Sequence, residues 1–134
     1  MPILQAADGR AVGPHYSSVN VTTDADGDAT EYSSTIITGK LETILYQKTD
    51  FADGVDFTIT TETTAQNLWV EEDVNASKEV HPEAPVHTYA GVASEYSTGF
   101  PVTKPFCIYG ERVKIVVAAG GPTKSGTFVI GWSV

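Results

Sequence analysis

Three aspartates near the N-terminal end have the alternating spacing of a calcium-binding loop. Asp24, Asp26 and Asp28 are separated by Ala25 and Gly27, and Ca²⁺ prefers clustered carboxylate oxygens as ligands. The rest of such a loop is missing, because its glycine and its final acidic residue do not occur at the required positions. Asp and Gly also form tight turns without a metal. The spacing therefore predicts a metal-free turn.

A second acidic group surrounds Gly54. Asp50, Asp53 and Asp56 could act as the acid and base of a glycosidase-like site, which needs two carboxyl groups. Their spacing is also typical of residues that flank a loop. The sequence contains no G-x-S-x-G nucleophile motif and no phosphate-binding glycine motif. We therefore predict that the chain is not an enzyme and needs no cofactor.

Two histidines and a glutamate form the third candidate site. His81, Glu83 and His87 lie within seven residues, and their side chains are of the types that bind zinc. Pro82 and Pro85 interrupt this segment, so no regular element holds the three side chains on a common face. We interpret them as surface-loop residues and predict no metal site.

The elements that position these residues are predicted to be β-strands. Val, Ile and Thr supply 40 of the 134 residues, against four Leu, and β-branched side chains favour strands. In residues 55–61, Val55, Phe57 and Ile59 alternate with polar residues, which is typical of a half-buried strand. No segment has helical periodicity. A chain of this length suffices for one domain and not for two.

Turn residues divide the chain into about seven to eight short strands. We expect strands at 17–23, 29–37, 41–49, 55–61, 67–72, 105–109, 112–118 and 125–132. The Asp-Gly turn between the first two predicts a hairpin, and residues 38–40 predict another turn. The pattern predicts an all-β domain over residues 17–134, either a single antiparallel β-sandwich or a small barrel. Residues 73–104 are proline-rich and irregular, and long loops of this kind are commonly functional.

Residues 1–16 show neither the period of a helix nor that of a strand, and we expect an extended N-terminal arm. A frayed terminus is the alternative. Ile3 and Leu4 are apolar and precede a stretch rich in Gly and Pro. This arrangement is typical of a segment that becomes ordered against a partner. The two residues are therefore candidate partner-binding residues, and we predict a homo-oligomer, either a dimer or a trimer.

Charge limits the class of partner. The formal net charge is −9, and so negative a surface repels nucleic acid. Lys104, Arg112 and Lys114, with Lys124, concentrate positive charge near the C-terminal end and are predicted to contact acidic partner surfaces. No stretch is apolar enough to predict a membrane span or a secretory signal. Cys107 is the single cysteine, and its apolar neighbours predict a buried thiol.

Aromatic residues leave one further possibility open. Trp69, Trp132 and the six tyrosines could form a platform that binds carbohydrate. Aromatic side chains on alternating strands more commonly pack in the core or against a neighbouring strand. A row of them on one exposed face would favour sugar binding.

Three segments carry a resemblance to a known group of proteins. They are KTDFADGVDFTITT at 48–61, WVEEDVN at 69–75 and ERVKIVVAAGGPTKSGTF at 111–128. With these phrases, residues 17–134 resemble small β-rich virion proteins encoded among the head genes of tailed bacteriophages. Residues 1–16 lie outside the resemblance.

The resemblance implies a capsid cement or decoration protein. Such a protein would be made in the host cytoplasm and would bind the major capsid protein on the outer surface of the virion head. A tail, neck or tail-tube component is the alternative from the same group, and a carbohydrate-binding β-sandwich module is the alternative from another class. The resemblance implies no particular functional residues.

Overall fold

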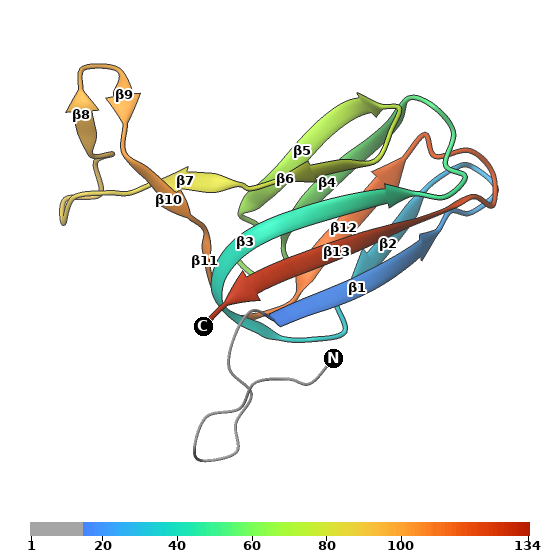
Figure 1. The fold of residues 1–134 in the computed structure, drawn as a ribbon, viewed down its shortest axis with the longest axis horizontal. Helices are drawn as coiled ribbons and strands as arrows, with labels where there is room; N and C mark the ends of the chain where they lie inside the picture. Colours follow the sequence, from blue (N-terminus) through green and yellow to red (C-terminus); the bar gives the residue numbers. More distant parts are fainter. Residues whose placement is uncertain (1–14) are drawn as a thin grey trace, which may run out of the picture.

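The computed structural model describes residues 15–134, which form antiparallel β-strands and no helix (Figure 1). The predicted all-β class is confirmed. The strands are more numerous than the predicted seven to eight, because residues 78–105 contribute five very short ones. In chain order they are β1 (His15–Thr22), β2 (Ala29–Tyr32), β3 (Ile37–Lys48), β4 (Val55–Thr61), β5 (Asn67–Val74), β6 (Lys78–Val80), β7 (Glu83–Pro85), β8 (Glu95–Ser97), β9 (Phe100–Pro101), β10 (Thr103–Pro105), β11 (Cys107–Glu111), β12 (Val113–Ala118) and β13 (Ser125–Ser133).

Two larger sheets form the body of the molecule. The first has the order β1-β13-β3-β11, with β6 also paired to β3. The second has the order β2-β12-β4-β5. In Figure 1 the first sheet lies in front of the second, and consecutive strands repeatedly change from one sheet to the other.

Side chains from both sheets enclose one apolar core. Tyr46 on β3 and Phe128 on β13 belong to the first sheet, and Phe57 on β4 belongs to the second. The ring centroid of Phe57 lies 4.6 Å from that of Tyr46 and 4.9 Å from that of Phe128. All three side chains are buried. These edge-to-face contacts join the two sheets directly, because each ring fills the space between the facing layers.

The alternation predicted for residues 55–61 is confirmed. Val55, Phe57 and Ile59 on β4 are buried, and so are Val113, Ile115 and Val117 on the neighbouring strand β12. In a strand, every second side chain points to the same face of the sheet. The two central strands of the second sheet therefore cover the core with matching rows of apolar side chains.

The predicted hairpin between residues 17–23 and 29–37 is wrong. The strand β1 pairs with β13, whereas β2 pairs with β12 in the other sheet. Asp24 does form a tight turn, since its Oδ1 accepts hydrogen bonds from the backbone N–H groups of Asp26 and Asp28, at 2.8 and 3.0 Å. The turn leads the chain from one layer to the other. This path lets the apolar residues of β1 cover the core.

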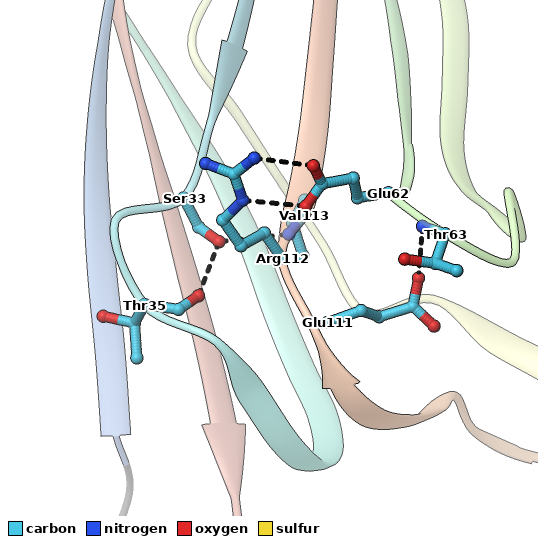
Figure 2. A network of polar contacts seen from close by, with 7 residues as sticks. All are labelled: Ser33, Thr35, Glu62, Thr63, Glu111, Arg112 and Val113. Atoms are coloured by element: carbon cyan, nitrogen blue, oxygen red, sulfur yellow. Dashed lines mark hydrogen bonds and ion pairs between the residues drawn. The ribbon is translucent and has the colours of Figure 1, made fainter.

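The second predicted strand also ends earlier than expected. The Oγ of Ser33 donates to the carbonyl oxygen of Thr35 at 2.8 Å and accepts from the N–H of Val113 at 3.0 Å (Figure 2). The chain turns after Tyr32 because the Ser33 hydroxyl, in place of a backbone carbonyl, accepts the hydrogen bond from β12.

Residues 38–40 form no turn, and β3 runs continuously through them. Gly39 allows this path because β13 approaches it closely. A Cβ atom at Gly39 would lie 2.2 Å from the carbonyl oxygen of Ser133, and its φ of +149° is one that other residues rarely adopt. The glycine therefore marks a close approach of two backbones.

The boundary predicted at residue 17 differs from that of the structure. The strand β1 begins at His15, so two residues of the expected arm belong to the first sheet. Ile3 and Leu4 lie outside the described residues.

Cys107 is exposed, contrary to the prediction. Its neighbour Ile108 is buried, and adjacent residues of β11 point to opposite faces. Because Ile108 occupies the core side, the thiol of Cys107 points toward solvent.

Candidate interaction surface

Residues 81–105 extend away from the two sheets and are called the projection below (Figure 1). At its base, β7 and β10 pair antiparallel, with Ala84 opposite Lys104. Further out, the Val86 N–H donates to the carbonyl oxygen of Val102 at 2.9 Å, and the Val102 N–H donates to that of Ser94 at 2.8 Å. The N–H of Ser94 in turn donates to the carbonyl oxygen of Val86 at 2.9 Å. The projection is therefore held by a continuous set of backbone hydrogen bonds.

Two tight turns form the outer end of the projection. The N–H of Thr88 donates to the carbonyl oxygen of Val92 at 2.8 Å, and Gly91 within this turn has a φ of +76°. The second turn joins β8 and β9, where the side chain of Glu95 accepts a hydrogen bond from the N–H of Gly99. A positive φ is accessible to glycine at little cost. The two turns therefore give the outer end a defined shape.

The outer end exposes large apolar side chains. Tyr89 is fully exposed, and Val92, Tyr96 and Phe100 retain 62, 74 and 56% of their exposed area. The rings of Tyr96 and Phe100 lie 5.9 Å apart between centroids, so they form one exposed aromatic pair. Exposed apolar groups gathered at one place are typical of surfaces that bind another macromolecule.

No side chain of the projection belongs to the buried core of residues 15–134. The chain orders these residues with backbone hydrogen bonds, and their aromatic groups bury little surface within the molecule. Such an arrangement stabilises the isolated fold only weakly, because burial of apolar surface is the main source of stability. The exposed rings therefore remain accessible to a binding partner.

A cleft lies where the projection leaves the body. Both apolar and polar side chains line it. The lining residues are Gln66, Ala84, Pro85, Val86, Lys104, Pro105, Phe106 and Cys107. The exposed thiol of Cys107 therefore lies at the base of the projection.

Charge is sparse on the projection. Its ionised side chains at neutral pH are Glu83, Glu95 and Lys104, in a chain whose net charge is −9. Glu83 accepts a hydrogen bond from the Thr103 hydroxyl at 2.6 Å. Lys104 is exposed and forms no ion pair within residues 15–134. The projection is thus less acidic per residue than the rest of the chain.

The three predicted basic residues do not form one cluster. Lys104 lies on β10, whereas Arg112 precedes β12 and Lys114 lies within it. Figure 2 shows the Arg112 guanidinium paired with Glu62, with Nε–Oε2 and Nη2–Oε1 distances of 2.7 and 2.6 Å. The guanidinium also lies 4.4 Å from the ring centroid of Tyr32. Arg112 therefore serves an internal contact, and Lys104 is the basic residue located on the projection.

Glu111 is buried beside this ion pair. Its Oε1 accepts a hydrogen bond from the N–H of Thr63 at 2.7 Å (Figure 2). Thr64 donates to Oε1 through its N–H at 3.0 Å and to Oε2 through its hydroxyl at 2.9 Å. The backbone hydrogen bond from Thr64 is the largest of the effects that lower the pKa of Glu111. The carboxylate thereby fixes the turn between β4 and β5.

The other carboxylate candidates also hold turns. Asp50 Oδ1 accepts from the Ser125 N–H at 2.6 Å, and Asp56 Oδ1 accepts from the Asp73 N–H at 3.0 Å. Asp53 forms an ion pair with Lys48. These contacts give each carboxylate a separate structural role.

The histidine-containing group is not arranged around a metal. His81 Nδ1 lies 2.9 Å from the carbonyl oxygen of Glu42, whereas His87 forms a β-bridge with Ala93. Within residues 15–134, no three His, Cys, Asp or Glu side chains are grouped as metal ligands would be.

The two tryptophans form no exposed platform. Trp69 packs against Phe57 and Trp132 stacks on His15, and both indoles are buried. Tyr89 and Tyr96 are exposed and belong to the six tyrosines considered for such a platform, whereas the exposed Phe100 was not considered from the sequence. Their one signal is their position among Gly, Ser and Pro, where too few apolar neighbours occur to build a core.

Comparisons with known proteins identify no relative: no family model, curated protein or solved structure matches this chain. In the described part of the chain, no helix is long and apolar enough to cross a membrane.

Proposed function

We propose that this chain is a non-enzymatic virion structural protein, a capsid cement or decoration protein that binds the outer surface of a bacteriophage head. In this proposal residues 17–134 are a β-sandwich domain, extended at its N-terminal end by His15 and Tyr16, and the projection contacts the major capsid protein. The observation that carries the proposal is the ordered projection with Tyr89, Tyr96 and Phe100 exposed at its outer end.

The projection supports binding to a protein surface. Aromatic side chains are the residues that most often dominate the binding energy of protein interfaces. The backbone hydrogen bonds hold the projection in one shape before binding, so less conformational entropy is lost when a partner covers it. A partner with apolar pockets could therefore bury these rings at modest entropic cost.

The charge supports a position on the outside of the head. The interior of a filled head is packed with DNA phosphate, which repels a protein of net charge −9. A protein that binds only the assembled lattice stabilises that assembly by mass action. If the bound form is an oligomer, several weak contacts add their strengths through avidity.

A tail or tail-tube component is the second candidate, and the shape of the projection favours it. A projection that binds the body of the next identical copy is a head-to-tail contact, which closes into a ring or continues as a filament. Purified protein that forms rings or tubes by itself would favour this candidate over capsid cement.

The test of capsid binding uses heads that lack the protein, from the phage that encodes the chain. The triple variant Tyr89→Ser, Tyr96→Ser and Phe100→Ser should bind these heads at least about a hundredfold more weakly, because interface aromatics can each contribute about 2 kcal/mol. Tyr109→Ser is the matched control, since Tyr109 is exposed on β11 outside the projection. Unchanged binding of the triple variant would exclude the projection as the contact.

The cement role has a separate measurement. Heads with the protein bound should release DNA at a higher temperature than heads without it. Equal release temperatures at full occupancy would contradict a stabilising role and would favour a tail or neck component.

A further inference from the structure

The outer strands of the two sheets differ in how they avoid pairing with other chains. The strand β5 carries Glu71, Glu72 and Asp73, and its pairing with β4 shifts register twice. The strand β2 has only four residues and includes Glu31. Charge, irregular register and short length are the usual ways in which edge strands avoid unwanted pairing. These two edges are therefore protected.

The edge strand β1 has none of these protective features. Its eight residues, HYSSVNVT, include no Asp, Glu, Lys, Arg, Pro or Gly. Its pairing with β13 runs without a register shift from His15 opposite Trp132 to Thr22 opposite Ser125. An edge of this kind is a template for a further strand.

The register shows which backbone groups of β1 face outward. The N–H of Thr23, which follows β1, donates to the carbonyl oxygen of Lys124 at 2.8 Å. In an antiparallel pair, hydrogen-bonded and non-hydrogen-bonded positions alternate. The odd-numbered residues of β1 therefore bond to β13, and the even-numbered residues direct their N–H and C=O groups away from it. These residues are Tyr16, Ser18, Asn20 and Thr22.

These outward groups have no backbone partner within residues 15–134, where β1 pairs only with β13. An additional strand beside β1 would give these outward backbone groups their hydrogen-bond partners.

We propose that β1 pairs antiparallel with β1 of a second copy of this chain, which joins the two first sheets across a twofold axis. One register uses all four outward residues. It places Val19 opposite Val19 of the second copy, Ser18 opposite Asn20, and Tyr16 opposite Thr22. A shift of the axis to Ser18 would use only three of the outward residues.

The absence of acidic residues from β1 allows a second copy of this acidic chain to be the occupant. Two chains of net charge −9 repel one another, and an isologous contact places the same strip of each chain against the other. None of the 17 acidic residues lies in β1. The contact therefore brings the two acidic molecules together without opposing carboxylates on the paired strands. It is independent of the projection and of the proposed function.

The first test measures the mass of the full chain by analytical ultracentrifugation over a range of concentrations, without capsids. Asn20→Pro removes an N–H that faces outward, and proline is tolerated in an edge strand at such a position. Asn20→Pro should raise the dissociation constant of the dimer at least tenfold. Asn20→Ala is the control, because both variants lose the hydrogen bond from Thr127 Oγ1 to Asn20 Oδ1 and only proline loses the N–H. Thermal unfolding of both variants checks that the fold is kept.

The second test examines the register by disulfide formation in a Cys107→Ser background. Cα atoms at opposed non-hydrogen-bonded positions lie about 4.5 Å apart, which suits a disulfide. Val19→Cys should therefore give a covalent dimer on mild oxidation. Val21→Cys should not, since Val21 lies opposite Ser17 in this register.

The proposal would be overturned if the wild-type chain stayed monomeric at 100 times the protein concentration used to measure binding to heads. A strand of another protein would then be the alternative partner of β1. A dimer that survives Asn20→Pro unchanged, or one in which Val21→Cys cross-links and Val19→Cys does not, would also overturn it. Capsid binding can fail in either case without affecting these results.

Discussion

Single polar residues fix the turns of this protein more than any continuous motif does. Asp24 and Glu111 each accept hydrogen bonds from two backbone N–H groups, and Asp50 and Asp56 each accept one. Each of these carboxylates satisfies donors that the strands leave unpaired at their ends. The acidic composition therefore has a structural use in addition to its effect on partners.

Glu111 should make the stability of the fold depend on pH. Its pKa is lowered from an ordinary value of 4.5 by hydrogen bonds that exist only in the folded chain. Its stabilising contribution is therefore complete above pH 4.5 and is lost as the pH falls through the lower, folded-state pKa. Glu111→Gln should lower the melting temperature at pH 7, and the gap from the wild type should close toward pH 3.

The control for this measurement is Glu72→Gln, an exposed change on β5. It should leave the melting temperature and its pH dependence close to those of the wild type. A gap between wild type and Glu111→Gln that stays constant from pH 7 to pH 3 would show that packing, and not the charge of Glu111, causes the loss.

At the scale of the elements, the body and the projection depend on different interactions. The body has the mixed core of both sheets, whereas the projection has backbone hydrogen bonds and exposed rings. Replacing residues 83–105 with a short Gly/Ser linker should therefore leave the melting temperature within about 5 °C of the wild type. Circular dichroism follows the melting, and binding to heads should be lost. A collapse of the β-sheet signal would show that the projection is needed for folding.

Predictability also differs between the elements. Residues 55–61 and 112–118 could be recognised because strict alternation at Val55, Phe57 and Ile59, and at Val113 and Ile115, records a half-buried face locally. The pairing of β1 with β13 could not be recognised from the sequence, because the paired residues are at least 103 residues apart and no local signal specifies them. The nearby Asp-Gly turn instead favoured a hairpin.

The candidate surface was predicted only as a region. Proline and glycine in residues 73–104 correctly indicated an irregular segment, but not its ordered, projecting form. That form depends on hydrogen bonds between Val86, Ser94 and Val102, which are not adjacent in sequence. Arg112 was proposed as a binding residue from its positive charge, and its ion pair with Glu62 could not be predicted because Glu62 lies 50 residues away.

On the scale of the whole molecule, an acidic body carries a nearly neutral projection. Lys104 is the one basic residue of that projection, so it should speed the approach to an acidic partner surface. Charges at the rim of an interface act mainly on association rate and are screened by salt. Lys104→Glu should slow binding to heads severalfold at low ionic strength and have little effect at 0.5 M salt. Surface plasmon resonance measures the association rate at both salt concentrations.

Lys114→Glu serves as the comparison, because Lys114 lies on β12 and away from the projection. It should change the association rate less than Lys104→Glu does. Equal effects of the two variants would indicate that total charge, and not charge on the projection, determines the rate.

The pairing of the first strand with the last has a consequence for synthesis of the chain. The strand β13 lies between β1 and β3, so the first sheet cannot be completed until β13 has been translated and has left the ribosome. Until then β1 and β3 lack their shared neighbour. Contacts between distant residues also form slowly, because a long loop must close first. The first sheet should therefore form in a late step, after β13 has emerged, and a truncation within β13 should leave a nascent chain that chaperones bind.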